Sequence, residues 1–304
     1  MEQNGISIIS PSGVTENSAR KSKSIGITFR SNSAIQSAKE RLKAPWIKKK
    51  EEDSTWDKSM AVLAELIGTA ILVFLGCMAC LGGMKPYKAG DGPSLIHIAF
   101  AFGLAVMIAV QCVGHISGAY LNPAITFAAV ILGKRSPMMA GFYIVAQCLG
   151  AMLGYGLLQI ITPPRLTHDG DSNTAATFCT NNINSNLSGA QGLVAEAFAT
   201  GIFAFFACAS WDTRNAKNTD SLGLKFGLCV SMLCLAFIPH TGCSLNPART
   251  LGPAVWNNFW EHHWLYWVGP IGGAIIAATI YRCFFLKSQE TTTQDNGTLN
   301  GIET

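Results

Sequence analysis

Six long apolar stretches constrain this chain more than any other feature of its sequence. A helix needs about 20 apolar residues to cross the roughly 30 Å hydrocarbon core of a bilayer, and it satisfies its own backbone hydrogen bonds where lipid cannot. The stretches that meet this length cover approximately residues 60–83, 94–115, 137–161, 190–211, 222–240 and 262–286. The sequence therefore predicts an all-α membrane protein with six transmembrane helices.

The composition fits a membrane environment and argues against other classes. Of the 304 residues, 49% are hydrophobic and 13% are charged, whereas soluble domains usually carry about 25% charged residues. No basic stripe with interleaved aromatic residues is present, so no nucleic-acid partner is expected. The sequence also lacks a nucleophile elbow, a phosphate-binding loop and a metal-ligand cluster. We therefore expect no enzyme activity, no cofactor and no metal.

Lysine and arginine are unevenly distributed between the two ends of the predicted helices. If the helices alternate in direction, one end collects the basic N-terminal tail, the turn at 134–135, the loop 212–220 and Arg282. Cytoplasmic loops carry the excess of Lys and Arg, so both termini are predicted to be cytoplasmic in a multi-pass plasma-membrane protein. The long loop before residue 190 would face outward, where Asn186-Leu-Ser is a candidate N-glycosylation site.

Two short segments repeat each other between these stretches. "HISGAYLNPAIT" begins at residue 115 and "HTGCSLNPART" at residue 240, with Gly, Leu, Asn, Pro, Ala and Thr at matching offsets. Asparagine is a favoured N-cap and proline is well suited to the first helical position, so each motif predicts the start of a helix. The apolar piece that follows is too short to cross a bilayer, which predicts two re-entrant half-helices. The motif residues are Asn122, Pro123, Ala124, Asn246, Pro247 and Ala248.

The two halves of the chain resemble each other beyond these motifs. "AELIGTAILVF" opens the first half with Glu65, and "AEAFATGIFAF" opens the second with Glu196. An odd number of spans in each half inverts the second copy, a layout found in many transport proteins. We interpret the two glutamates as structural, each accepting hydrogen bonds from loop backbone. The alternative, a proton relay, needs ionisable partners, which these spans hardly supply.

An inverted repeat would bring the two half-helix starts together near the middle of the membrane, around a central pore. Asn122 and Asn246 would each cap a half-helix through the side-chain oxygen and point the NH2 group into the lumen. The aligned peptide dipoles place roughly half a positive charge at each start. Such a point repels cations and protons but admits neutral molecules, as is known for aquaporin-type pores.

The sequence resembles the aquaporin and aquaglyceroporin family, the major intrinsic proteins. "AELIGT", "SGAYLNPA", "TGCSLNPAR" and "WVGP" carry the resemblance, which runs from about residue 60 to 286. It implies passive transport by a channel domain, assigned to 56–288, usually in a homotetramer with four pores. The segment 1–55, basic and without a long apolar run, is predicted to be a disordered cytoplasmic tail, and 289–304 a second cytoplasmic tail.

The resemblance also implies a selectivity filter formed by Phe102, Cys234, Cys243 and Arg249. Water-selective members usually have histidine at the position of Cys234. Cysteine is smaller and a poor hydrogen-bond donor, so a wider, more apolar filter suited to glycerol or urea is expected. The alternative is that Cys234 is only a packing residue.

Two other positions resemble water channels instead. Aquaglyceroporins typically carry aspartate where this chain has Thr250, and they lack the aromatic pair found here as Tyr266 and Trp267. Insect channels described as entomoglyceroporins resemble this combination. The sequence thus predicts a passive channel for water and small uncharged solutes, including glycerol and urea, that excludes ions and protons. The alternatives are a strictly water-selective channel and a low-flux junctional or scaffolding membrane protein.

Most of the ten cysteines lie in apolar runs and are expected to be small apolar packing residues. Cys77 and Cys80 form a C-x-x-C sequence, but no second pair accompanies it, so a zinc site is not expected. The cysteines assigned to packing are Cys77, Cys80, Cys112, Cys148, Cys208, Cys229, Cys234 and Cys283.

Overall fold

The computed structural model describes residues 54–81, 93–167 and 177–286. Within these residues, six helices are long and apolar enough to cross a membrane, which confirms the predicted number. The predicted tails lie outside the described residues, except that Ser54 and Thr55 begin the first helix. The six helices are α2 (Thr55–Met78), α3 (Leu95–Ser117), α5 (Pro137–Ile161), α6 (Gly189–Ser210), α7 (Leu222–Thr241) and α9 (Leu265–Ile280), the last continued by the π-helical turn η3 (Tyr281–Phe285).

Serine caps set the start of several of these helices. Ser54 and Asp57 form a reciprocal capping box, so α2 begins at Thr55 and not near residue 60, where the apolar run begins. Ser188 and Gln191 form the same arrangement at the start of α6. The predicted boundary of the first span was therefore wrong because hydropathy does not register a polar cap.

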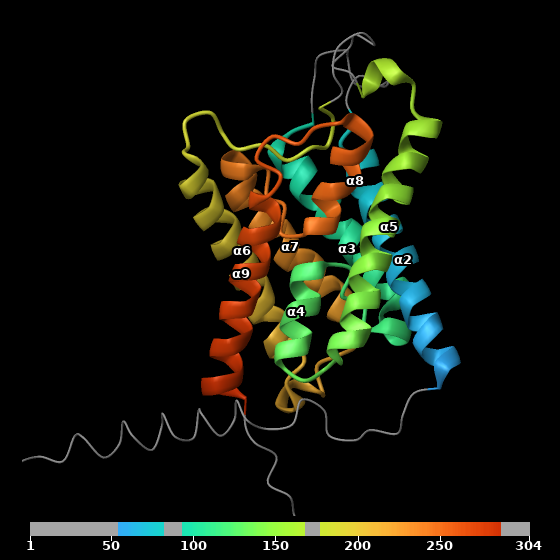
Figure 1. Ribbon diagram of the computed structural model, residues 1–304, viewed down its shortest axis with the longest axis vertical. Coiled ribbons are helices and arrows are strands. Elements are labelled where there is room, and N and C mark those ends of the chain that lie inside the picture. The colour runs from blue at the N-terminus through green and yellow to red at the C-terminus, as the bar shows by residue number, and fades with distance from the viewer. Residues whose placement is uncertain (1–53, 82–92, 168–176, 287–304) are drawn as a thin grey trace, which may run out of the picture.

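Two further helices are the predicted half-helices, α4 (Pro123–Ile131) and α8 (Pro247–Asn257). They lie toward opposite ends of the molecule, α4 in the lower part and α8 in the upper part of Figure 1. Within each half of the sequence, the first helix packs against the other two long ones: α2 against α3 and α5, and α6 against α7 and α9. Between the halves, α3 packs against α7, and each half-helix packs against the last span of the other half. This pattern is unchanged when the halves are exchanged, as an inverted repeat requires.

Glycine allows the backbones of α2 and α5 to approach closely. A Cβ atom on Gly150 would lie 2.2 Å from the carbonyl oxygen of Leu66, and one on Gly154 would lie 2.3 Å from that of Ala70. Neither position has room for a side chain. Small residues at such four-residue spacing are common where membrane helices touch.

Several basic residues lie at one end of the molecule, where they bond to carbonyl groups. Lys134 donates to the carbonyl oxygen of Trp211 at 2.8 Å, and Arg214 donates to that of Phe285 at 2.7 Å. Arg214 also pairs with Asp212 at 2.6 Å, and its hydrogen bonds hold the pKa of that carboxyl well below its usual range. This end also contains the start of α2 and the end of α9 (Figure 1).

Candidate pore and selectivity filter

A cavity of about 540 Å³ runs between the two halves. It reaches from Trp211 and Asp220, near the basic end, to Arg249. Residues from both halves line it, among them the predicted motif and filter residues Phe102, Asn122, Cys234, Cys243, Asn246 and Arg249. The structure thus brings together six residues, although the first, Phe102, and the last, Arg249, are more than a hundred positions apart in the sequence.

The two half-helix starts meet at this cavity and bond to each other. Asn122 accepts a hydrogen bond from the backbone N–H of Ala124 at 2.8 Å, and Asn246 accepts one from that of Ala248 at 3.0 Å. Across the interface, Nδ2 of Asn122 donates to the carbonyl oxygen of Leu245, and Nδ2 of Asn246 donates to that of Leu121, both at 2.7 Å. An amide nitrogen carries two N–H groups. One N–H group of each amide is therefore used between the halves, which the sequence did not indicate, and both asparagines also line the cavity.

The carbonyl groups that accept these bonds are aimed by an unusual backbone conformation. Leu121 and Leu245 have φ angles of 54° and 56°, in the left-handed region. Such a conformation costs a residue other than glycine about 1–3 kcal/mol and persists only where the surroundings enforce it. It recurs at the same place in both halves, so the repeated sequence folds into a repeated strained loop.

Glu65 supports the loop before α4. Its Oε1 accepts hydrogen bonds from the Ser117 hydroxyl at 2.6 Å and the Tyr120 backbone N–H at 2.9 Å. Its Oε2 accepts from the Leu121 N–H at 2.7 Å and the Gln147 amide at 2.8 Å. Four donors surround a carboxylate that is fully buried, and two of them are backbone groups of the strained loop.

Glu196 occupies the equivalent place before α8. It accepts hydrogen bonds from the Thr241 hydroxyl at 2.6 Å and from the backbone N–H groups of Ser244 and Leu245 at 2.9 and 3.1 Å. These donors, like those around Glu65, are hydroxyl, amide or backbone groups. The contacts favour the interpretation of both glutamates as acceptors for loop backbone over a proton relay.

The four predicted filter residues lie at the end of the cavity opposite Trp211 and Asp220. Phe102 comes from α3 and Cys234 from α7, whereas Cys243 precedes α8 and Arg249 belongs to it. The guanidinium carbon of Arg249 lies 4.5 Å from the centre of the Phe102 ring. Both cysteines are buried and line the cavity, so Cys234 faces the lumen and not lipid.

Arg249 is 6% exposed and is held by neutral groups. Among the described residues, it forms no ion pair with a carboxylate. Its Nη1 donates to the carbonyl oxygen of Cys179 at 2.8 Å and to Oδ1 of Asn181 at 2.6 Å. The guanidinium therefore lines the cavity without a carboxylate in direct contact among these residues. Sequence reasoning missed Cys179 and Asn181, which lie in a loop that repeats nothing in the first half.

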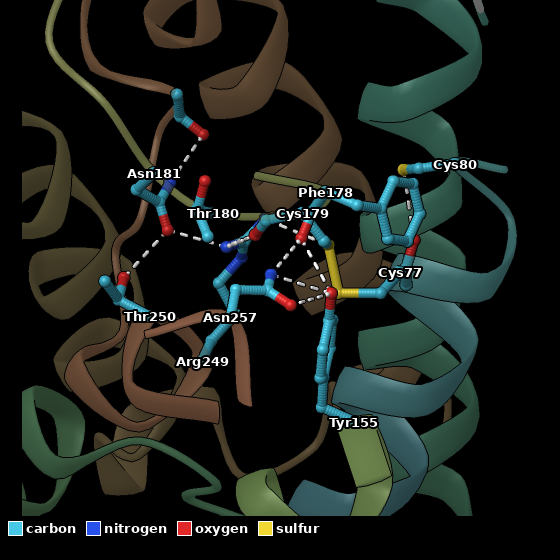
Figure 2. Close-up of a disulfide and its surroundings, with 12 residues drawn as sticks. Cys77, Cys80, Tyr155, Phe178, Cys179, Thr180, Asn181, Arg249, Thr250 and Asn257 are labelled. Atoms are coloured by element: carbon cyan, nitrogen blue, oxygen red, sulfur yellow. Dashed lines mark hydrogen bonds between the residues drawn. A yellow bond between two sulfur atoms is a disulfide. The ribbon is translucent and has the colours of Figure 1, made fainter. Parts of the chain in front are cut away.

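One cysteine assignment was wrong. Cys77 is not a free packing residue but forms a disulfide with Cys179 (Figure 2). The two are 102 residues apart, and the apolar run around Cys77 gives no sign of a partner. The remaining cysteines assigned to packing form no disulfide among the described residues, and only Cys112 among them is exposed.

A membrane-spanning inverted repeat that encloses a cavity lined from both halves defines a transport channel. The family model of the major intrinsic proteins matches residues 52–281, and the chain belongs to this family. Its members are channels for water or small solutes, not enzymes.

Known relatives agree with this assignment. The chain is 39% identical over 233 residues to Aquaporin-4 of Mus musculus, covering 76% of this chain and 68% of that one. It is 37% identical over 245 residues to Aquaporin-2 of Bos taurus, covering 81% and 86% of the two chains. The X-ray structure of the aquaglyceroporin from Plasmodium falciparum has the same fold, with a TM-score of 0.64, 22% sequence identity, and coverage of 74% of this chain and 96% of that one.

Proposed function

We propose that this channel passes water together with glycerol and urea. The observation that carries the proposal is the small side chain of Cys234 on the lumen wall at the filter. A thiol takes less space than an imidazole and donates poorly, so the carbon face of a polyol fits beside it. Arg249 on the same ring supplies donors for the hydroxyl or carbonyl groups of the solute.

The same geometry supports exclusion of ions and protons. The N-terminal ends of α4 and α8 meet at the cavity and present partial positive charge. The cation of Arg249 adds a second positive charge at the filter itself. A cation crossing the lumen would meet both, whereas a neutral solute meets only hydrogen-bond donors.

For the cell, we propose a plasma-membrane homotetramer with both termini in the cytoplasm. The basic end agrees with the positive-inside rule. The disulfide of Cys179 lies in the loop before α6, which this orientation places outside, where disulfides persist. Asn186 is exposed in the same loop, and we propose it as a glycosylation site. The tetramer and the insect subgroup rest on family resemblance alone.

Shrinkage of proteoliposomes in a stopped-flow instrument tests the proposed solutes. Purified protein is exposed in turn to sucrose, glycerol and urea gradients. We expect fast water efflux in sucrose and, in glycerol and urea, re-swelling well above that of protein-free liposomes. Water flux without re-swelling would instead support a strictly water-selective channel, and no flux at all would support the scaffolding alternative.

Mercurial reagents should block the channel through the filter thiols. Cys243 and Cys234 both line the cavity, and a mercury adduct on either would fill the lumen. We expect a several-fold loss of water permeability that added thiol reverses, and a smaller loss in a Cys243→Ser variant. Unchanged permeability in both the parent and the variant would contradict the placement of these thiols at the filter.

A further inference from the structure

The filter arginine and the disulfide share one residue. Cys179 is bonded through sulfur to Cys77, in the last turn of α2, and its carbonyl oxygen accepts the 2.8 Å hydrogen bond from Nη1 of Arg249. Nη2 of Arg249 lies 3.7 Å from the Cys179 sulfur itself. Figure 2 shows the guanidinium between Asn181 on one side and the disulfide on the other.

Cys179 holds a conformation that its own preferences oppose. Its φ angle is 61°, a left-handed value that residues other than glycine rarely adopt. The preceding residue is anchored separately, because the carbonyl oxygen of Phe178 accepts hydrogen bonds from the Tyr155 hydroxyl at 2.8 Å and from Nδ2 of Asn257 at 3.0 Å. These two hydrogen bonds hold the loop in place at Phe178, whereas the disulfide bond to Cys77 restrains the side chain of Cys179.

The second acceptor of Arg249 does not depend on the disulfide. Asn181 donates through Nδ2 to the carbonyl oxygen of Gly242 at 3.0 Å, and its Oδ1 accepts from the Thr250 hydroxyl at 2.8 Å. Loss of the disulfide would therefore spare this contact. The contacts at risk are those that Cys179 supplies, from its carbonyl oxygen and its sulfur.

We propose that the Cys77–Cys179 disulfide is a positioning device for the selectivity filter. It holds Cys179 in the left-handed conformation and thereby keeps Arg249 against the wall of the pore. Without the sulfur–sulfur bond, Cys179 relaxes and its carbonyl group turns away. A guanidinium stays charged and needs acceptors, and Arg249 already lines the cavity. The side chain then moves into the lumen and narrows the filter.

Reduction in the reconstituted protein tests the proposal in a chain that has already folded with its disulfide intact. A phosphine reductant cleaves the sulfur–sulfur bond, each cysteine gains one electron and one proton, and the phosphine becomes its oxide with oxygen from water. In reconstituted wild-type protein, we expect glycerol permeability to fall several-fold and water permeability to fall less, because water is smaller. Removal of the reductant and re-oxidation should restore both. Mass spectrometry with a thiol label confirms the redox state.

Two cysteine variants control this experiment. Cys77→Ser should show the low glycerol-to-water permeability ratio from the start and should not respond to reductant. Cys80→Ser is the matched control, since this thiol is three residues from Cys77, lies outside the disulfide, and donates a hydrogen bond to the carbonyl oxygen of Gly76 at 3.1 Å. It should retain both the wild-type ratio and the wild-type response. An unchanged ratio after verified reduction, or a full response in Cys77→Ser, would overturn the proposal.

A third variant tests whether the disulfide acts through the arginine. Arg249→Val has no guanidinium to release, so reductant should leave its permeability ratio unchanged, and a response as large as in wild type would refute the mechanism. If this variant does not fold, the other comparisons still decide. The glycerol measurement rests on the proposed function, which oxidised wild type tests by itself. Should glycerol not pass, the change in water permeability on reduction still tests the role of the disulfide.

Discussion

Replacing Glu196 with glutamine is expected to destabilise the channel severely. The carboxylate accepts hydrogen bonds at both oxygens, from the Thr241 hydroxyl and the Ser244 N–H at one and from the Leu245 N–H at the other. A glutamine has one oxygen, so its NH2 group must face a buried donor. Each unsatisfied buried group costs about 1–3 kcal/mol, and the strained Leu245 loses its support as well. We expect thermal unfolding in detergent at a clearly lower temperature and little folded protein to reconstitute.

The control for this prediction is Glu261→Gln, the same substitution at an exposed glutamate. Glu261 is 58% exposed, and its Oε1 lies 3.8 Å from Nδ1 of His262. The same substitution there should leave unfolding temperature and water permeability unchanged. Normal stability of the Glu196→Gln protein would contradict the structural role. It would reopen the relay interpretation, in which the substitution removes a proton-carrying group and leaves the fold intact.

The local part of this fold was readable from the sequence. Hydropathy located the six spans because lipid imposes one length on every crossing helix. The Asn-Pro pairs located the starts of α4 and α8 because capping depends on adjacent residues alone. The start of α2 was misplaced because the prediction used hydropathy alone there, and its Ser54 cap lies outside the apolar run.

The parts that could not be read depend on distant residues. No property of leucine indicates that Leu121 and Leu245 adopt left-handed conformations, which are enforced by glutamates more than 40 residues earlier in the chain. The partner of Cys77 is 102 residues away in a loop without a repeat. One acceptor of Arg249 is the backbone carbonyl oxygen of Cys179, which every residue type has, so residue identity carries no sign of that contact.

Replacing Cys234 with histidine is expected to convert the channel toward water selectivity. The imidazole would project into the cavity that the thiol now lines, narrow the ring shared with Phe102 and Arg249, and offer a donor to passing water. Size differences of this order in a binding pocket discriminate by about tenfold or more. We therefore expect glycerol permeability to fall by about tenfold, while water permeability in a sucrose gradient stays within a few-fold of wild type.

Two matched variants separate this effect from damage to the fold. Cys234→Ser preserves the size of the side chain and should keep glycerol flux, because the width of the lumen is unchanged. Cys112→His makes the same substitution at an exposed cysteine of α3, outside the filter, and should change neither permeability. If Cys234→His passed glycerol as well as the wild type did, the filter would be too wide for this position to govern it. Selectivity would then have to depend on the other three residues of the ring, Phe102, Cys243 and Arg249, of which Arg249 lies 4.5 Å from the centre of the Phe102 ring.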